Sequence, residues 1–146
     1  MCIEVARMLL RARCRSAGKF KFVVDDCRGH SVVVDLPPEL GGGDEGPMAS
    51  ELGLMALAGC AAQIFKFVAE KKRIPVRDLE VFAELEKPLG KRARGLKLKI
   101  VVDADAELGE LRRVWEVGKS LYPVVVDIFE RAGLEVEPQV EIRGRQ

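Results

Sequence analysis

Alternating apolar and polar residues in the first 35 positions predict three consecutive β-strands. We expect them over residues 5–15, 19–25 and 30–35, because alternate side chains along much of each segment are apolar and would share one face. Short turns at residues 16–18 and 26–29 separate these segments. Strands joined by tight turns pair antiparallel, so the segment is expected to form a three-stranded meander.

The next segment is a loop followed by the most apolar stretch of the chain. Residues 36–50 contain Pro-Pro, three consecutive glycines and Pro47, which exclude a regular strand or helix interior. Ser50 is expected to be the N-cap of a helix over residues 51–72. The first half of this helix is apolar on every side, which predicts burial all round. Since 146 residues leave little room to enclose it, we expect a homodimer with this helix at its centre.

The rest of the chain predicts two more strands, two helices and a last strand. Pro123 should separate the helices, Gly133 should end the second one, and Pro138 predicts that the last strand lies at a sheet edge. Runs of strands separated by helices indicate an α+β fold in one domain over residues 1–146. The expected elements are strands at 79–87 and 96–103, helices at 107–121 and 124–132, and a strand at 134–142.

Composition narrows the function classes. With 24 basic and 23 acidic residues the net charge is +1, which gives no support for a nucleic-acid or membrane partner. One histidine and four cysteines without a CxxC motif argue against a zinc site. We expect neither a signal peptide nor a membrane span, and therefore a cytoplasmic protein with reduced thiols. The absence of Asn and Thr, with 32% charged residues, suits a thermophile.

The segment 39–62 carries the most specific pattern. A glycine-rich loop is followed by Gly-Pro, a carboxylate and a cysteine on an apolar helix, and this order resembles the OsmC/Ohr family, most closely its OsmC-like branch. The resemblance implies antiparallel β-sheets packed around a long buried helix in an intertwined homodimer. The residues that carry it are Gly46, Pro47, Glu51, Leu52, Leu54, Ala56, Leu57 and Cys60.

The resemblance also implies a chemistry. Family members reduce organic hydroperoxides with two cysteines and no cofactor: one thiolate becomes a sulfenic acid, the second forms a disulfide with it, and an external dithiol restores both. By this resemblance Cys60 is the candidate peroxidatic thiol, and Glu51 is the candidate glutamate that acts with an arginine to lower the thiol pKa. The implied partners are a hydroperoxide and a thiol reductant.

Three positions depart from the family pattern. The resolving Cys-Pro step is Tyr122-Pro123 here, and Tyr122 could instead hydrogen-bond a ligand or pack against Trp115. The strand that carries the family's arginine has Lys21 instead, which supplies a charge without the guanidinium fork. Glu51 is nine residues before Cys60 and so faces the opposite side of a continuous helix, whereas Ser50 lies nearer the cysteine face.

Alternatives remain open from sequence alone. Cys60 could be an inert buried residue, Cys27 could be a second resolving thiol or a bystander, and Cys2 and Cys14 are interpreted as structural. The first functional hypothesis is a hydroperoxide reductase that uses Cys60 with an external thiol. The second is a non-catalytic homodimer that binds a small molecule or a protein. Nucleic-acid binding through the basic first strand is a weaker third.

Overall fold

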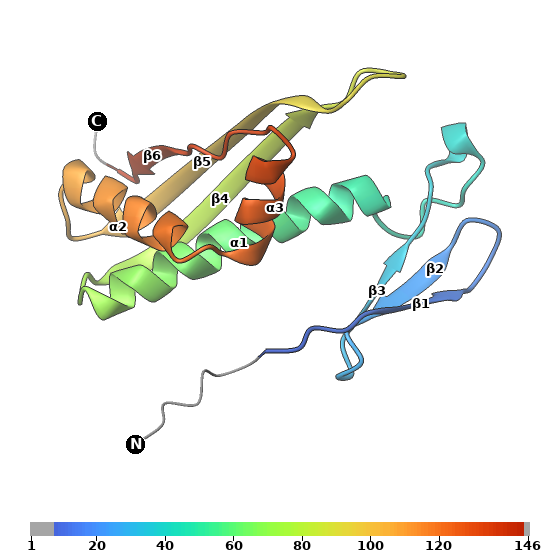
Figure 1. Ribbon diagram of the computed structural model, residues 1–146, viewed down its shortest axis with the longest axis horizontal. Coiled ribbons are helices and arrows are strands. Elements are labelled where there is room, and N and C mark those ends of the chain that lie inside the picture. Colours follow the sequence, from blue (N-terminus) through green and yellow to red (C-terminus); the bar gives the residue numbers. More distant parts are fainter. Residues whose placement is uncertain (1–7, 145–146) are drawn as a thin grey trace. The chain divides into compact units, whose positions relative to one another are not determined.

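The computed structural model describes residues 8–144 of the chain. The chain forms two compact units, Met1–Leu52 and Gly53–Gln146, and the helix α1, Ala49–Lys71, begins in the first and continues through the second. The first unit contains a three-stranded sheet and a long loop. The second contains α1, a further three-stranded sheet and two shorter helices (Figure 1).

The sheet of the first unit is the predicted antiparallel meander. Its strands are β1, Arg13–Ser16, β2, Phe22–Asp25, and β3, Ser31–Val34, in the order β1-β2-β3. Phe22 is opposite Val34, and Val24 is opposite Val32, so one face of the sheet is apolar.

The first two strands are shorter than expected. Residues 8–12 are not part of a strand, and Met8, Leu9 and Leu10 are largely exposed; the predicted positions 5–7 lie outside the described residues. Phe20, expected to point inward, lies in the bend before β2 and is 38% exposed. Alternation alone overextended both strands because a strand ends where its pairing partner ends.

Helix α1 begins two residues earlier than predicted. Ser50 is therefore inside its first turn and is not the N-cap, which corrects the sequence-based assignment. One stripe of the helix is buried, but Met55 and Phe67 are about half exposed, so the described part of its own unit does not cover the helix on every side. The buried stripe consists of Leu57, Ala61, Phe65, Val68 and Ala69.

The length and composition of α1 also correct the expectation that no segment could span a membrane. The helix has 23 residues and a mean hydropathy of 1.7 over its most apolar stretch, which suffices for crossing a bilayer by these two criteria alone. Core helices of soluble proteins meet the same criteria. The buried stripe of α1 is part of the hydrophobic core of the second unit.

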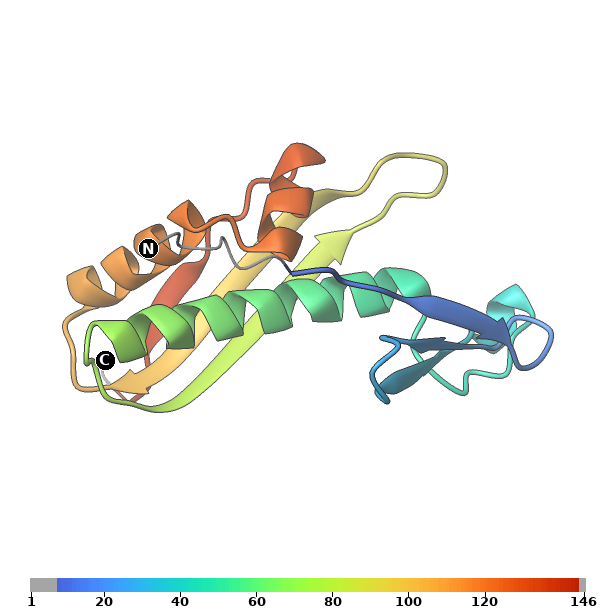
Figure 2. The same ribbon diagram turned by 60° about the horizontal axis from the view of Figure 1, so that its bottom comes forward.

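The second unit is a sheet with helices packed on one face. Strands β4, Val76–Glu86, and β5, Arg94–Ala104, pair antiparallel, and β6, Gln139–Ile142, adds parallel to β5 at the edge, as Pro138 predicted. Helices α2, Leu108–Ser120, and α3, Val124–Arg131, follow β5. Alternate residues of β5, the stripe of α1, and Trp115 of α2 form one core, with α1 and α2 on the same face of the sheet (Figure 2).

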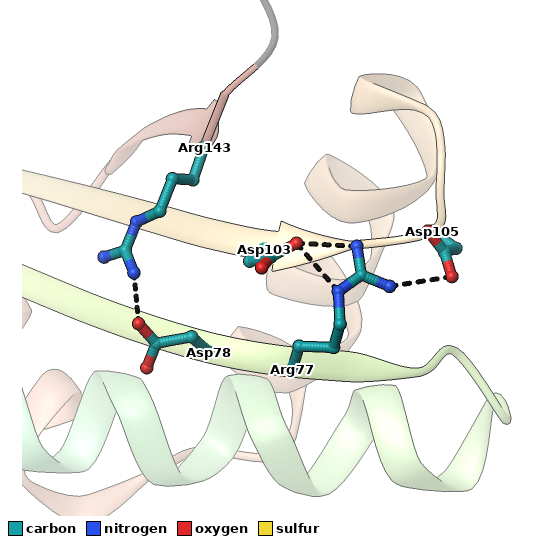
Figure 3. Close-up of polar contacts among 5 residues, drawn as sticks. All are labelled: Arg77, Asp78, Asp103, Asp105 and Arg143. Carbon is teal, nitrogen blue, oxygen red and sulfur yellow. Dashed lines mark hydrogen bonds and ion pairs between the residues drawn. The ribbon is translucent and has the colours of Figure 1, made fainter.

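The other face of this sheet carries a network of ion pairs (Figure 3). Arg77 of β4 binds Asp103 at 2.6 Å and Asp105 at 2.8 Å. Arg143, just after β6, reaches across β5 to Asp78 and Glu80 of β4. The hydrogen bond from Arg143 holds the pKa of Asp78 below its ordinary value. The network therefore joins all three strands on the side opposite the apolar core.

Replacing Arg143 with glutamine should lower the free energy of unfolding at neutral pH. Because the folded-state pKa of Asp78 lies below its unfolded value of about 3.9, the stabilisation is present above that value and is lost as the pH falls through the folded pKa. Urea unfolding of wild type and Arg143→Gln should therefore differ at pH 7 and converge towards pH 3. Arg92→Gln, in the exposed β4–β5 hairpin, is the control. An equal difference between wild type and Arg143→Gln at both pH values would contradict this assignment.

Candidate functional site

Cys60 lies in the fourth turn of α1, at the edge of the buried stripe. Its neighbours Leu57 and Ala61 are completely buried, whereas Gly59 on its other side is exposed. The thiol is free and half-buried, and it packs against the core of the second unit. A thiol in this position is neither sealed inside the core nor fully solvated, which is compatible with attack on a small substrate.

Glu51 acts on the start of α1. Its carboxylate oxygen Oε2 accepts a hydrogen bond of 2.8 Å from the backbone N–H of Met48, the residue before the helix. This is one half of a capping box, in which the third helical residue reaches back to the N-cap. Nine residues of helix separate Glu51 from Cys60, a rise of roughly 13 Å. Within one chain, therefore, Glu51 serves the helix terminus.

Lys21 immediately precedes β2 and is held in an ion pair. Its Nζ lies 2.6 Å from the Oε2 of Glu45, in the glycine-rich loop. The hydrogen bond and the charge of Glu45 raise the pKa of Lys21, so Lys21 stays protonated. The candidate activating cation thus has a carboxylate partner within its own unit.

The glycine-rich loop is organised around one buried carboxylate. Asp35 is only 4% exposed, and it accepts backbone hydrogen bonds from Leu36 at 2.8 Å, from Gly43 at 3.2 Å and from Glu45 at 3.2 Å. Burial opposes ionisation, but these hydrogen bonds outweigh it and hold the pKa of Asp35 below its ordinary value. The loop is therefore a built structure, and the carboxylate replaces the regular pairing that the loop backbone lacks.

Two glycines of the loop are required by close packing. A Cβ atom at Gly42 would lie 1.9 Å from the carbonyl oxygen of Leu36, and one at Gly46 would lie 2.1 Å from that of Val33. No side chain fits at either distance without a backbone shift. The glycine content of this segment thus reflects the folding of the loop onto the end of β3.

Tyr122 occupies a strained position between α2 and α3. Its φ of +54° is in the left-handed region, and its side chain is 74% exposed. Trp115, by contrast, is 2% exposed, so little of the Tyr122 side chain packs against Trp115 or the sheet among residues 8–144. Tyr122 instead lines a small hollow of about 180 Å³ next to Lys119, which forms an ion pair of 2.8 Å with Glu130.

The other cysteines are exposed where the structure describes them. Cys27 lies in the turn between β2 and β3 with a φ of +61°, as its predicted turn position implies. Cys14, on β1, is also exposed, and Cys2 lies outside the described residues. Within residues 8–144, no group of three or more histidine, cysteine or carboxylate side chains is arranged to hold a metal ion.

Lys21 and Glu51 were both predicted to belong to the site, but each binds a different group. Lys21 binds Glu45, and Glu51 binds the backbone of Met48. Asp35 and Glu45 are not among the site residues predicted from the sequence. The available signal for Asp35 was a charged residue that ends an apolar strand directly before Leu-Pro-Pro, where a side chain can cap the following loop.

The family assignment rests on the sequence pattern of the central part of the chain. Residues 41–138 match the family described as OsmC-like protein. The chain belongs to this family. No curated protein sequence matches it.

Solved structures of OsmC-like proteins share the fold. The OsmC-like protein from Mycoplasma pneumoniae has a TM-score of 0.80 at 12% identity, covering 94% of this chain and 99% of its own. An organic hydroperoxide resistance protein OsmC from Legionella pneumophila has a TM-score of 0.61 at 17% identity, covering 94% and 98%. An organic hydroperoxide resistance protein from Elizabethkingia anophelis has 0.69 at 17%, covering 95% and 99%. These similarities establish an OsmC-like α+β fold.

Replacing Gly46 with alanine should disturb the loop. The added methyl group requires a backbone shift, and we expect the free energy of unfolding to fall by about 1–3 kcal/mol. Gly109→Ala in α2 is the matched control, since its Cβ would meet only an arginine side chain at 3.8 Å. Urea unfolding followed by circular dichroism measures both. A Gly46→Ala variant as stable as Gly109→Ala would show that the loop accommodates a side chain there.

Proposed function

We propose that this OsmC-like protein reduces organic hydroperoxides with Cys60 as the only reacting thiol of its own chain. The Cys60 thiolate attacks one oxygen of the peroxide bond, the O–O bond breaks, and the other oxygen leaves with its electron pair and takes up a proton as an alcohol. Cys60 becomes a sulfenic acid. An external thiol then attacks the sulfenic sulfur and releases water, and a second external thiol cleaves the mixed disulfide, which regenerates Cys60.

The observation that carries this proposal is the environment of Cys60. Cys60 is a free, half-buried thiol at the edge of the α1 stripe, so its position is fixed by the core and its side chain remains accessible to a small substrate. Membership of the OsmC-like family and the names of the hydroperoxide resistance proteins that share the fold support the same chemistry. We propose Lys21 as the cation that stabilises the thiolate, and we assign Glu51 and Ser50 to the start of the helix that carries Cys60.

Tyr122 is the reason for proposing an external thiol. A tyrosine at the position where the family has its second cysteine cannot form a disulfide. Its side chain is exposed and borders a hollow, so its hydroxyl is available to hydrogen-bond an oxygen of a bound ligand. The chain would then depend on small thiols in a reducing cytoplasm.

We further propose that the active form is an intertwined homodimer with one OsmC-like domain, residues 1–146, per chain. Two apolar faces are exposed among residues 8–144, one in each unit. One is the side of α1 that carries Met55 and Phe67, next to a hollow of about 780 Å³ between α1 and β4. The other is the face of the β1–β3 sheet that carries Phe22 and Val32. Contiguous exposed apolar surface is typical of an interaction site, and a second copy offers apolar surface of the same kind.

The reductase proposal predicts loss of turnover in Cys60→Ser. Purified protein with cumene hydroperoxide and dithiothreitol should consume peroxide, and Cys60→Ser should reduce the rate to the uncatalysed background because the nucleophile is gone. Cys27→Ser and Cys14→Ser are matched controls that should retain most of the rate. Wild-type protein without turnover and without dimedone labelling at Cys60 would instead support the non-catalytic binding alternative.

The dimer proposal predicts that a large side chain at Gly59 separates the subunits. Gly59 is exposed on α1, and among residues 8–144 a Cβ there meets nothing within 4 Å beyond its chain neighbours and the backbone of its own helix turns, so Gly59→Leu should leave the folded chain intact but obstruct a second copy. Light scattering after size exclusion should show a dimer for wild type and for Gly109→Leu, and a monomer for Gly59→Leu. A monomeric wild type at micromolar concentration would contradict the dimer.

A further inference from the structure

The hairpin between β4 and β5, residues 87–94, carries several cations and no acidic residue. Its sequence is KPLGKRAR. At the base of the hairpin, Arg94 is paired with Glu86 of β4 at 3.1 Å. Lys91 and Arg92, nearer the tip, are exposed and form no ion pair in the described part of the chain. Positive charge that no carboxylate neutralises is therefore concentrated at the tip.

The tip of the hairpin is an ordered turn. The N–H of Lys91 donates to the carbonyl oxygen of Pro88 at 3.2 Å, and Gly90 has the positive φ, +70°, that the third residue of a type II turn requires. The Nζ of Lys87 donates to the carbonyl oxygen of Pro88 at 2.9 Å and also to that of Lys91. These hydrogen bonds hold Leu89 at the corner of the turn, where its side chain is completely exposed.

The hairpin projects from the second unit. In both views it extends beyond the sheet, and neither α2 nor α3 covers it (Figure 1, Figure 2). A single exposed leucine is common on protein surfaces and indicates nothing by itself. An apolar side chain that projects together with unpaired cations matches an anionic lipid surface, which offers head groups to the cations and an apolar medium to the leucine. A polyanion such as RNA would bind the cations but would leave the leucine in water.

We propose that the β4–β5 hairpin docks this protein on an anionic lipid surface, with Leu89 in the membrane interface and Lys87, Lys91 and Arg92 at the head groups. The net charge of the whole chain is +1, so the attraction is local to the hairpin. Each cation near an anionic surface raises the partition coefficient about fivefold, and three cations raise it about 100-fold. The docking is peripheral and does not depend on the reductase proposal.

Vesicle co-sedimentation of the full-length protein tests the docking. Wild type should sediment with vesicles made of equal parts phosphatidylglycerol and phosphatidylcholine, should remain in solution with pure phosphatidylcholine, and should be released by added salt. Lys91→Gln/Arg92→Gln should lower the partition coefficient about 30-fold, because two cations are lost. Lys72→Gln/Arg73→Gln is the matched control. It removes two cations from the exposed turn at the opposite end of β4 and should bind as wild type does.

Substitutions of Leu89 distinguish a bilayer from other polyanions. Leu89→Ser should lower the partition coefficient several-fold and leave any binding of polyuridylic acid unchanged, since only a bilayer receives an apolar side chain. Leu89→Trp should gain a blue-shifted fluorescence emission when anionic vesicles are added. Wild type should not show this shift, because its Trp115 is buried in the core.

Two results would overturn the proposal directly: equal binding of wild type to both kinds of vesicle, or an unchanged partition coefficient in Lys91→Gln/Arg92→Gln. A partition coefficient that Leu89→Ser does not change, together with equally tight binding of polyuridylic acid, would show a general polyanion site and would also overturn it. Cys60→Ser should dock as wild type does, so loss of peroxide turnover and loss of docking are measured independently.

Discussion

The burial of one stripe of α1 is the constraint on which the candidate site depends. Leu57, Ala61 and Phe65 are completely buried against β5 and α2, and burying a leucine or phenylalanine side chain contributes roughly 1.5–3 kcal/mol. Rotation of the helix about its axis would expose this stripe. The rotation is therefore fixed, and with it the position of Cys60 at the border between the core and the exposed side.

Elements with local signals were predicted well. The helix expected over residues 107–121 is Leu108–Ser120, and Gly133 has the left-handed φ of +85° that a residue after a helix needs. The meander and the edge position of the last strand also follow from local patterns. Strand lengths did not, because alternation continues along residues 8–12 without a partner strand to pair with. The length of a strand depends on the segment that it pairs with, so the periodicity of one segment does not predict where the strand ends.

The residues of the candidate site also fall into those that the sequence could predict and those that it could not. Cys60 could be selected from its residue type, its apolar helix and the family pattern. The helical repeat predicted that Glu51 and Cys60 face opposite sides of α1. In agreement with this, the Glu51 carboxylate accepts a hydrogen bond from the N–H of Met48 at the start of the helix. The partnership of Lys21 with Glu45 could not be predicted, since 24 residues separate them and their contact depends on how a buried Asp35 folds the loop backbone. Contacts of this kind arise from loop closure and have no periodic signature.

The parallel pairing of β6 with β5 has a consequence for the folding pathway. The β4–β5 hairpin joins neighbouring segments, whereas Lys99 of β5 pairs with Gln139 of β6 across 40 residues that include α2 and α3. Closing such a long connection has an entropic cost, and this cost is offset only by the contacts that form when the intervening helices dock on the sheet. The edge strand should therefore form late, after α1 and the hairpin have collapsed onto each other, so that a nascent chain exposes the bare edge of β5 until residues 139–142 have been synthesised.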